Sequence, residues 1–156
     1  MVSAERTGST PRRAAQNRPP RAAERRPGGN APRVLLDQDF HGGNLAALRT
    51  AVAALARDVA DAGTAESVIL VAHELSSNSV RHGGGSGRLR MWVAGRAVHC
   101  EVSDHGAGLA DPDTVGRELP PHAAPGGRGL WLARRMSDLH ISTGDRGTTV
   151  TAVVAL

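Results

Sequence analysis

The segment VILVAHELSSNSVRHGGGSG, from Val68 to Gly87, is predicted to be a helix that ends in a run of glycines. An apolar-to-small stripe recurs in it at helical spacing and can face a core. Its members are Val68, Val71, Ala72, Leu75 and Ser79. Glu74, Asn78 and His82 recur every four residues, so they share one edge beside that stripe. Polar side chains at the border of a buried helix face can line a cleft. The alternative is an ordinary solvated helix edge.

The residues before this helix predict a strand and a first helix. Val34 to Phe40 reads as a short strand that ends at Gly42-Gly43. Asn44 is a good N-cap for a helix with Leu45, Leu48, Val52, Leu55 and Val59 on one face. Gly63 is expected to stop that helix. Thr64 is then expected to cap the central helix, with Glu66 in its first turn.

The residues after the glycines predict two hairpins separated by a loop and a helix. Apolar residues alternate over 89–93 and 98–102 around Gly95-Arg96, which predicts a β-hairpin. A proline-rich loop over 110–126 is typical of a functional lid or of disorder. Residues 126–137 read as a helix, and 140–154 as a second hairpin that turns at 144–147. This order predicts an α+β fold, a two-layer α/β sandwich with helices on one face of a mixed, mostly antiparallel sheet.

Composition limits the classes of function. The chain has 156 residues, which suits one compact domain. All nineteen basic residues are Arg, so a phosphate-binding loop of the P-loop type lacks its lysine. Cys100 stands alone in a strand pattern and reads as a small buried hydrophobe. No apolar run approaches a membrane span and no secretory segment is visible, so we expect a cytoplasmic protein.

The positive charge is concentrated in residues 1–33, which hold eight Arg against Glu5 and Glu24. This Arg- and Pro-rich tail is poor in large apolar residues, so we expect it to be disordered and the folded domain to cover 34–156. A basic tail can contact nucleic acid or an acidic partner. It has no aromatic residue to stack on bases, so we favour a solvated extension and do not expect direct nucleic-acid binding.

Three motifs in order resemble those of the Bergerat-fold ATPases, a superfamily that includes gyrase, sensor histidine kinases and the MutL repair proteins. The motif from Glu74 to His82, ELSSNSVRH, is similar to the N box. Asp104-His-Gly-Ala-Gly108 resembles the G1 box, and Gly127-Arg-Gly-Leu130 resembles the G2 box. Gly147-Thr148-Thr149 lies where the family has its terminal Gly-Thr element. The resemblance spans residues 34–156 and implies a Bergerat fold that binds ATP and Mg²⁺.

The residue types suit nucleotide chemistry. Asp104 can accept the exocyclic amine of adenine, and guanine carries a carbonyl at that position. Gly106 and Gly108 leave room for the ring. Asn78 offers a neutral oxygen to Mg²⁺. Phosphates would meet the helix N-terminus at Gly127, Arg128, Gly129 and Leu130.

The resemblance also assigns roles that chemistry alone leaves open. It implies that Glu74 is the general base. It also implies a water-mediated adenine contact for Thr148 or Thr149, and both remain open. His82 has a phosphate-side position, and the alternative is a structural cap at the helix end.

Within the superfamily, the compact lid and the Glu-X-X-X-Asn-X-X-X-His form of the N box look most like bacterial anti-sigma-factor serine/threonine kinases. We expect no complete sensor histidine kinase, because no helix pair with an accepting histidine precedes the domain. The resemblance implies that the partners are a sigma factor and a STAS-type anti-anti-sigma protein, which is phosphorylated. Members of the family often form homodimers, and the sequence leaves open whether this chain does. The competing hypothesis is a non-catalytic, ATP-gated regulatory binding module, against which Glu74 argues.

Overall fold

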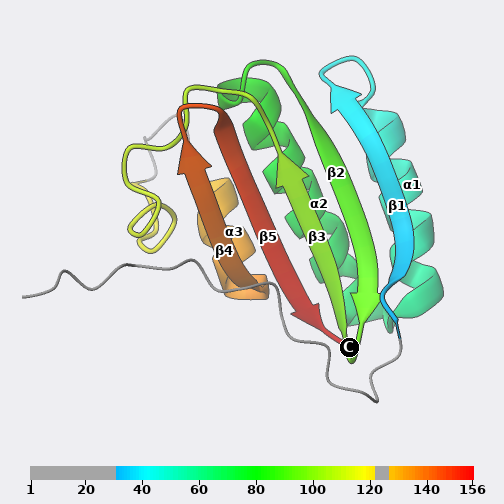
Figure 1. Ribbon diagram of the computed structural model, residues 1–156. Coiled ribbons are helices and arrows are strands. Elements are labelled where there is room, and N and C mark those ends of the chain that lie inside the picture. Colours follow the sequence, from blue (N-terminus) through cyan, green and yellow to red (C-terminus); the bar gives the residue numbers. More distant parts are fainter. Residues whose placement is uncertain (1–30, 122–126) are drawn as a thin grey trace, which may run out of the picture.

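The computed structural model describes residues 31–121 and 127–156. In Figure 1 they form one sheet with helices behind one of its faces. The strands are β1 (Arg33–His41), β2 (Ser86–Ala94), β3 (Ala97–Ser103), β4 (Asp138–Gly144) and β5 (Gly147–Ala155), in the sheet order β1-β2-β3-β5-β4. The helices are α1 (Leu45–Val59), α2 (Ala62–His82) and α3 (Arg128–Met136). The predicted two-layer α+β fold is confirmed. All pairings between the described strands are antiparallel, so they contain none of the parallel pairing that a mixed sheet allows.

The buried stripe of α2 is the centre of the core. All five predicted members of the stripe are buried, from Val68 to Ser79. They pack with the inward-facing residues of β2, β3 and β5, which include Leu89, Cys100 and Ala152, each 0% exposed. Burial of apolar area therefore fixes the rotation of α2 about its axis, and this rotation fixes where the edge with Glu74, Asn78 and His82 points.

The boundary between α1 and α2 differs from the prediction. α1 ends at Val59 and α2 begins at Ala62, with Asp61 and not Thr64 as the N-cap. Asp61 Oδ1 accepts the amides of Thr64 at 3.0 Å and Gly63 at 2.9 Å, and Oδ2 accepts the Thr64 hydroxyl at 2.9 Å. These bonds, those from Thr64 above all, hold the pKa of the Asp61 carboxyl below its usual range. Gly63 therefore belongs to the first turn of α2 and does not stop α1. Glu66 lies beyond that turn.

Two smaller differences lie at the other ends. Asn44 stands at the N-cap of α1 as expected, but its side-chain oxygen accepts the amide of His41 at 2.8 Å and caps no amide of the first turn. Arg33 belongs to β1, one residue inside the predicted tail. The rest of the predicted disordered tail falls mainly on residues 1–30, which lie outside the described residues, as do residues 122–126 of the predicted lid.

Both predicted hairpins are present, and the second places the site. β5 lies between β3 and β4, and its hairpin partner β4 forms the edge of the sheet (Figure 1). Ser103 at the end of β3 pairs with Thr149, and the Asp104 amide donates to the carbonyl of Thr148 at 2.9 Å. The residues after β3, the start of β5 and the C-terminal end of α2 therefore meet at one end of the domain. Among the described helices, none is long and apolar enough to cross a membrane.

Candidate functional site

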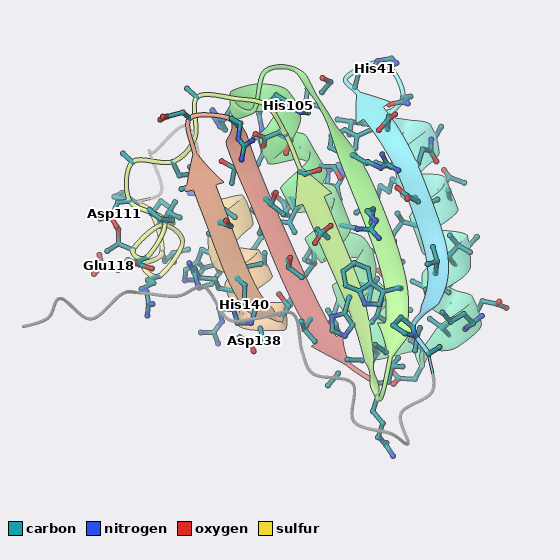
Figure 2. The ribbon with its side chains drawn as sticks, in the orientation of Figure 1. His41, His105, Asp111, Glu118, Asp138 and His140 are labelled. Atoms are coloured by element: carbon teal, nitrogen blue, oxygen red, sulfur yellow. The ribbon has the colours of Figure 1, made fainter. Side chains whose placement is uncertain are left out.

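The carboxylate of Asp104 joins three parts of the chain. Its Oδ2 accepts the Ser79 hydroxyl of α2 at 2.9 Å. Its Oδ1 accepts the amides of Gly106 at 3.1 Å and Thr148 at 3.2 Å. Three donors hold the carboxylate in one orientation, which an aspartate at a strand end would not keep by itself. Figure 2 shows the neighbouring His105 at this end of β3.

A cavity of about 210 Å³ opens beside this carboxylate. Its walls come from α2, the 104–109 turn, the 110–121 segment, the start of α3 and β5. The lining is Leu75, Asn78, Ser79, His82, Gly83, Asp104, Gly108, Leu109, Val115, Gly127, Leu130, Thr148 and Val150. Five of these side chains are apolar, and among the polar residues Ser79 and Thr148 donate hydrogen bonds to Asp104. Such a lining suits a flat ring that carries a polar edge.

Glycine is required where α2 meets the 104–109 turn. A Cβ on Gly106 would lie 2.6 Å from Gly83 Cα, and a Cβ on Gly83 would overlap the Asp104 carboxylate. Gly108 has φ +81°, and a Cβ there would lie 2.9 Å from the Gly144 carbonyl oxygen. These glycines let three backbone segments approach each other and leave the cavity open.

The start of α3 packs directly against the polar edge of α2. A Cβ on Gly129 would overlap Glu74 Oε2 and lie 3.4 Å from Asn78 Nδ2. The structure therefore brings together the residues predicted as N box and G2 box. Asn78 Oδ1 accepts the Arg81 guanidinium at 3.2 Å. Glu74 is half-buried and also borders a surface groove with His73 and Arg81, on the side away from the Asp104 cavity.

The first turn of α3 offers backbone donors to the cavity. Gly127 is its N-cap with φ +90° and lines the cavity together with Leu130, which is buried. The amides at a helix start have no acceptor within the helix, and the helix dipole adds partial positive charge there. Arg128 is exposed beside them. These groups can bind an anion.

The remaining predicted residues separate into two groups. His82 is exposed at the end of α2 and lines the cavity, as does Thr148, which is 8% exposed. Thr149 is half-buried and is absent from the cavity wall; it borders a second hollow, which the β4–β5 turn and Thr148 also line. Of the two threonines that the sequence left open, Thr148 is therefore the one beside the cavity.

Sequence reasoning missed several contributors to the site. It assigned Ser79 only to the core, although a hydroxyl within an apolar stripe is a signal for a buried hydrogen bond. It did not single out Thr143, which accepts the Leu109 amide at 2.8 Å and lies 3.0 Å, between hydroxyl oxygens, from Thr148. Val115 lines the cavity from a loop that showed no periodicity.

The donor set fits a nucleotide with a magnesium ion. In residues 31–121 and 127–156, no three His, Cys, Asp or Glu side chains form a group that could hold a metal. Asn78 supplies one neutral oxygen. Mg²⁺ commonly takes one or two protein oxygens and completes its shell with waters and phosphate oxygens. The glycine-lined cavity and the amides of α3 leave space and donors for such a phosphate.

The antiparallel sheet, the helices on one face and this cavity define a two-layer α+β domain of the histidine kinase ATPase type. The chain belongs to the histidine kinase-like ATPase domain family, whose sequence model matches residues 42–154. This membership supports ATP binding and a regulatory, kinase-type function. No curated protein matches the chain.

The fold is shared with solved structures of a blue-light activated histidine kinase. The histidine kinase domain of the Erythrobacter litoralis EL346 blue-light activated histidine kinase has a TM-score of 0.52 and 20% identity, over 70% of this chain and 61% of that one. A structure of the EL346 kinase gives the same TM-score and identity, over 74% of this chain and 41% of that one. The mycobacterial sensor histidine kinase MprB has a TM-score of 0.49 and 11% identity, over 77% and 97%. The chain thus spans less than two thirds of the length of both EL346 structures.

Proposed function

We propose that this protein is an ATP-dependent serine/threonine kinase of the anti-sigma-factor type. It would bind a sigma factor, phosphorylate a STAS-type antagonist and so regulate transcription by partner switching. One observation carries the proposal: the start of α3 lines the cavity beside Asp104 and also packs against the Glu74 carboxylate of α2. These groups offer a base-binding end, an anion-binding end and a proton acceptor.

The base-binding end is Asp104. A carboxylate has about four lone-pair sites, and Asp104 uses three of them for Ser79, Gly106 and Thr148. One acceptor site is left, which suits the exocyclic amine of adenine. Guanine would place a carbonyl against the carboxylate and be rejected. The apolar wall of Leu75, Val115 and Leu130 would contact the faces of the ring.

The anion-binding end is the start of α3. The amides that follow Gly127 would donate to phosphate oxygens, and Arg128 would add positive charge. His82, on the cavity wall at the end of α2, lies where it could also contact the phosphate side. Asn78 would give its side-chain oxygen to Mg²⁺.

Glu74 would be the catalytic residue. Bound MgATP would supply the transferable phosphoryl group. Glu74 would take the proton of the acceptor serine or threonine hydroxyl, a role that contributes roughly 10²–10⁴-fold in rate. Its carboxylate packs against the start of α3, which would hold the phosphates, and it also borders an open groove with His73, Ser77 and Arg81, through which an acceptor hydroxyl could approach the phosphate end.

Labelled ATP tests this function and separates it from a non-catalytic, ATP-gated module. The purified protein and its Glu74→Gln variant are incubated with γ-labelled ATP and STAS-type proteins captured from cell extract. We expect the wild type, and not the variant, to place acid-stable label on serine or threonine. Acid-labile label would indicate phosphohistidine and contradict the proposal. ATP binding without any transfer to captured partners would favour the gated module.

A further inference from the structure

A turn over residues 111–117 forms part of the cavity wall and rests on α3. Within it, the Val115 amide donates to the Asp111 carbonyl at 3.2 Å and the Arg117 amide donates to the Thr114 carbonyl at 3.0 Å. Figure 2 shows this segment beside β4 and α3, with Asp111 and Glu118 on its outer side. The side chain of Val115 lines the cavity. The position of this turn therefore decides whether the cavity keeps this part of its wall.

Arg134 of α3 joins this turn to the helix. Its Nε donates to the Val115 carbonyl at 2.8 Å, and its Nη2 donates to the Pro112 carbonyl at 3.2 Å. One half-buried guanidinium thus satisfies two carbonyls of the turn. Leu130 lies one helical turn before Arg134 on α3. Gly116 of the turn has φ +75° and approaches Leu130 so closely that a Cβ on Gly116 would be 2.8 Å from the Leu130 carbonyl carbon. The turn is held at two successive levels of α3.

We propose that Arg134 is a positioning residue for the nucleotide, which it does not touch. By fixing the 111–117 turn on α3, it holds Val115 against the cavity and joins that wall to the helix whose start carries the anion-binding amides. Loss of Arg134 would leave those amides and Asp104 in place but release the Val115 wall. The predicted consequence is faster nucleotide dissociation. This inference rests on the proposed nucleotide binding.

The test compares Arg134→Met with Arg135→Met. Methionine keeps most of the aliphatic stem of Arg134 and removes both donors. Arg135 is the matched control, because it is the next residue on the same helix, is exposed, and stacks over Trp131 at 5.4 Å. Dissociation of a fluorescent ATP analogue is measured by chase with excess ATP. We expect roughly a tenfold increase in koff for Arg134→Met, equivalent to ~1.4 kcal/mol, and less than a twofold change for Arg135→Met.

Trypsin reports on the turn without relying on nucleotide. Arg117 is exposed, and cleavage after it is followed by mass spectrometry. We expect Arg134→Met to be cut there faster than wild type without nucleotide, and Arg134→Lys, which keeps one donor group, to be intermediate. Thermal unfolding confirms that each variant is folded. Equal cleavage of wild type and Arg134→Met, or an equal rise in koff for Arg135→Met, would overturn the inference. If the wild type binds no nucleotide, the proposed function fails and koff cannot support Arg134, but cleavage still tests the tether.

Discussion

Replacing Asp104 by asparagine removes one charge and exchanges one acceptor oxygen for a donor. The asparagine carbonyl is expected to keep the position of Oδ1, because it must still accept the amides of Gly106 and Thr148. The new NH₂ group then takes the place of Oδ2 and faces Ser79, whose hydroxyl can turn and accept. The fold retains its hydrogen bonds. The cavity, however, now presents a donor where the adenine amine would donate.

The magnitude follows from that mismatch. A hydrogen bond to a charged group contributes about 1.5–3 kcal/mol. Loss of this interaction corresponds to about a 10- to 150-fold rise in the Kd for ATP, at 1.4 kcal/mol per tenfold. The folded state loses less, because neutral hydrogen bonds replace charged ones. A destabilisation of about 1 kcal/mol would lower the Tm by about 4 °C.

Calorimetric titration with ATP and GTP, together with thermal unfolding, measures both effects. Asp145→Asn is the matched control, since it removes the same charge from the exposed β4–β5 turn and from no part of the Asp104 cavity wall. We expect the control to bind ATP like the wild type. If Asp104→Asn binds ATP within threefold of the wild type while remaining folded, Asp104 does not recognise the base.

Four further outcomes are expected. Glu74→Gln should leave the Kd for ATP within about twofold and reduce phosphotransfer by roughly 10²–10⁴-fold, measured with labelled ATP; normal transfer would remove Glu74 as the base. Asn78→Ala should make the Kd for ATP independent of Mg²⁺, and an unchanged magnesium titration would contradict the ligand role. Gly106→Ala should lower stability by about 1–3 kcal/mol, because its Cβ would meet Gly83 backbone atoms at 2.6–2.9 Å; denaturant unfolding checks this, and a stable variant would mean that the two segments can separate cheaply. Burial raises the pKa of the Cys100 thiol to about 12, so at pH 8 a disulfide reagent should react with it only after unfolding; fast reaction of the native protein would show that β3 opens.

The raised pKa of the Cys100 thiol also predicts how the free energy of unfolding depends on pH. Its folded pKa lies above its ordinary value of 9.0, so the folded protein holds this proton more tightly than the unfolded chain. The contribution to stability is complete below pH 9 and is lost as the pH rises toward 12. A Cys100→Ala variant should lack this alkaline component of the unfolding free energy.

Local patterns predicted most of the elements. The spacing of Val68, Leu75 and Ser79 identified the buried side of α2, and alternation around Gly95 identified the first hairpin. The failure at Gly63 has a physical cause. Glycine is typical of helix ends, but here Asp61 accepts the amides of Gly63 and Thr64 and so places Gly63 in the first turn of α2. Only the three-dimensional geometry shows which of the two helices Gly63 belongs to.

The site was predictable as a set of motifs but not as a network. Asp104 and Gly129 follow from turn sequences, whereas the contact of Gly129 with Glu74 joins positions far apart in the chain. The same holds for the bond from Ser79 to Asp104 and for those from Arg134 to the 111–117 turn. Serine in a core stripe and arginine on a helix are each common for other reasons. Neither residue type signals its partner.

The position of β5 between β3 and β4 affects how the protein folds during synthesis. On the ribosome, β1, β2 and β3 emerge before β5, so β3 has an unpaired edge, with Val98 and Val102 uncovered by their later neighbours, until residues 147–155 are synthesised. The Thr148 amide that orients Asp104 arrives in the same step. Nascent chains stalled before Thr148 should therefore not bind nucleotide, and nucleotide binding should begin only once β5 has been synthesised.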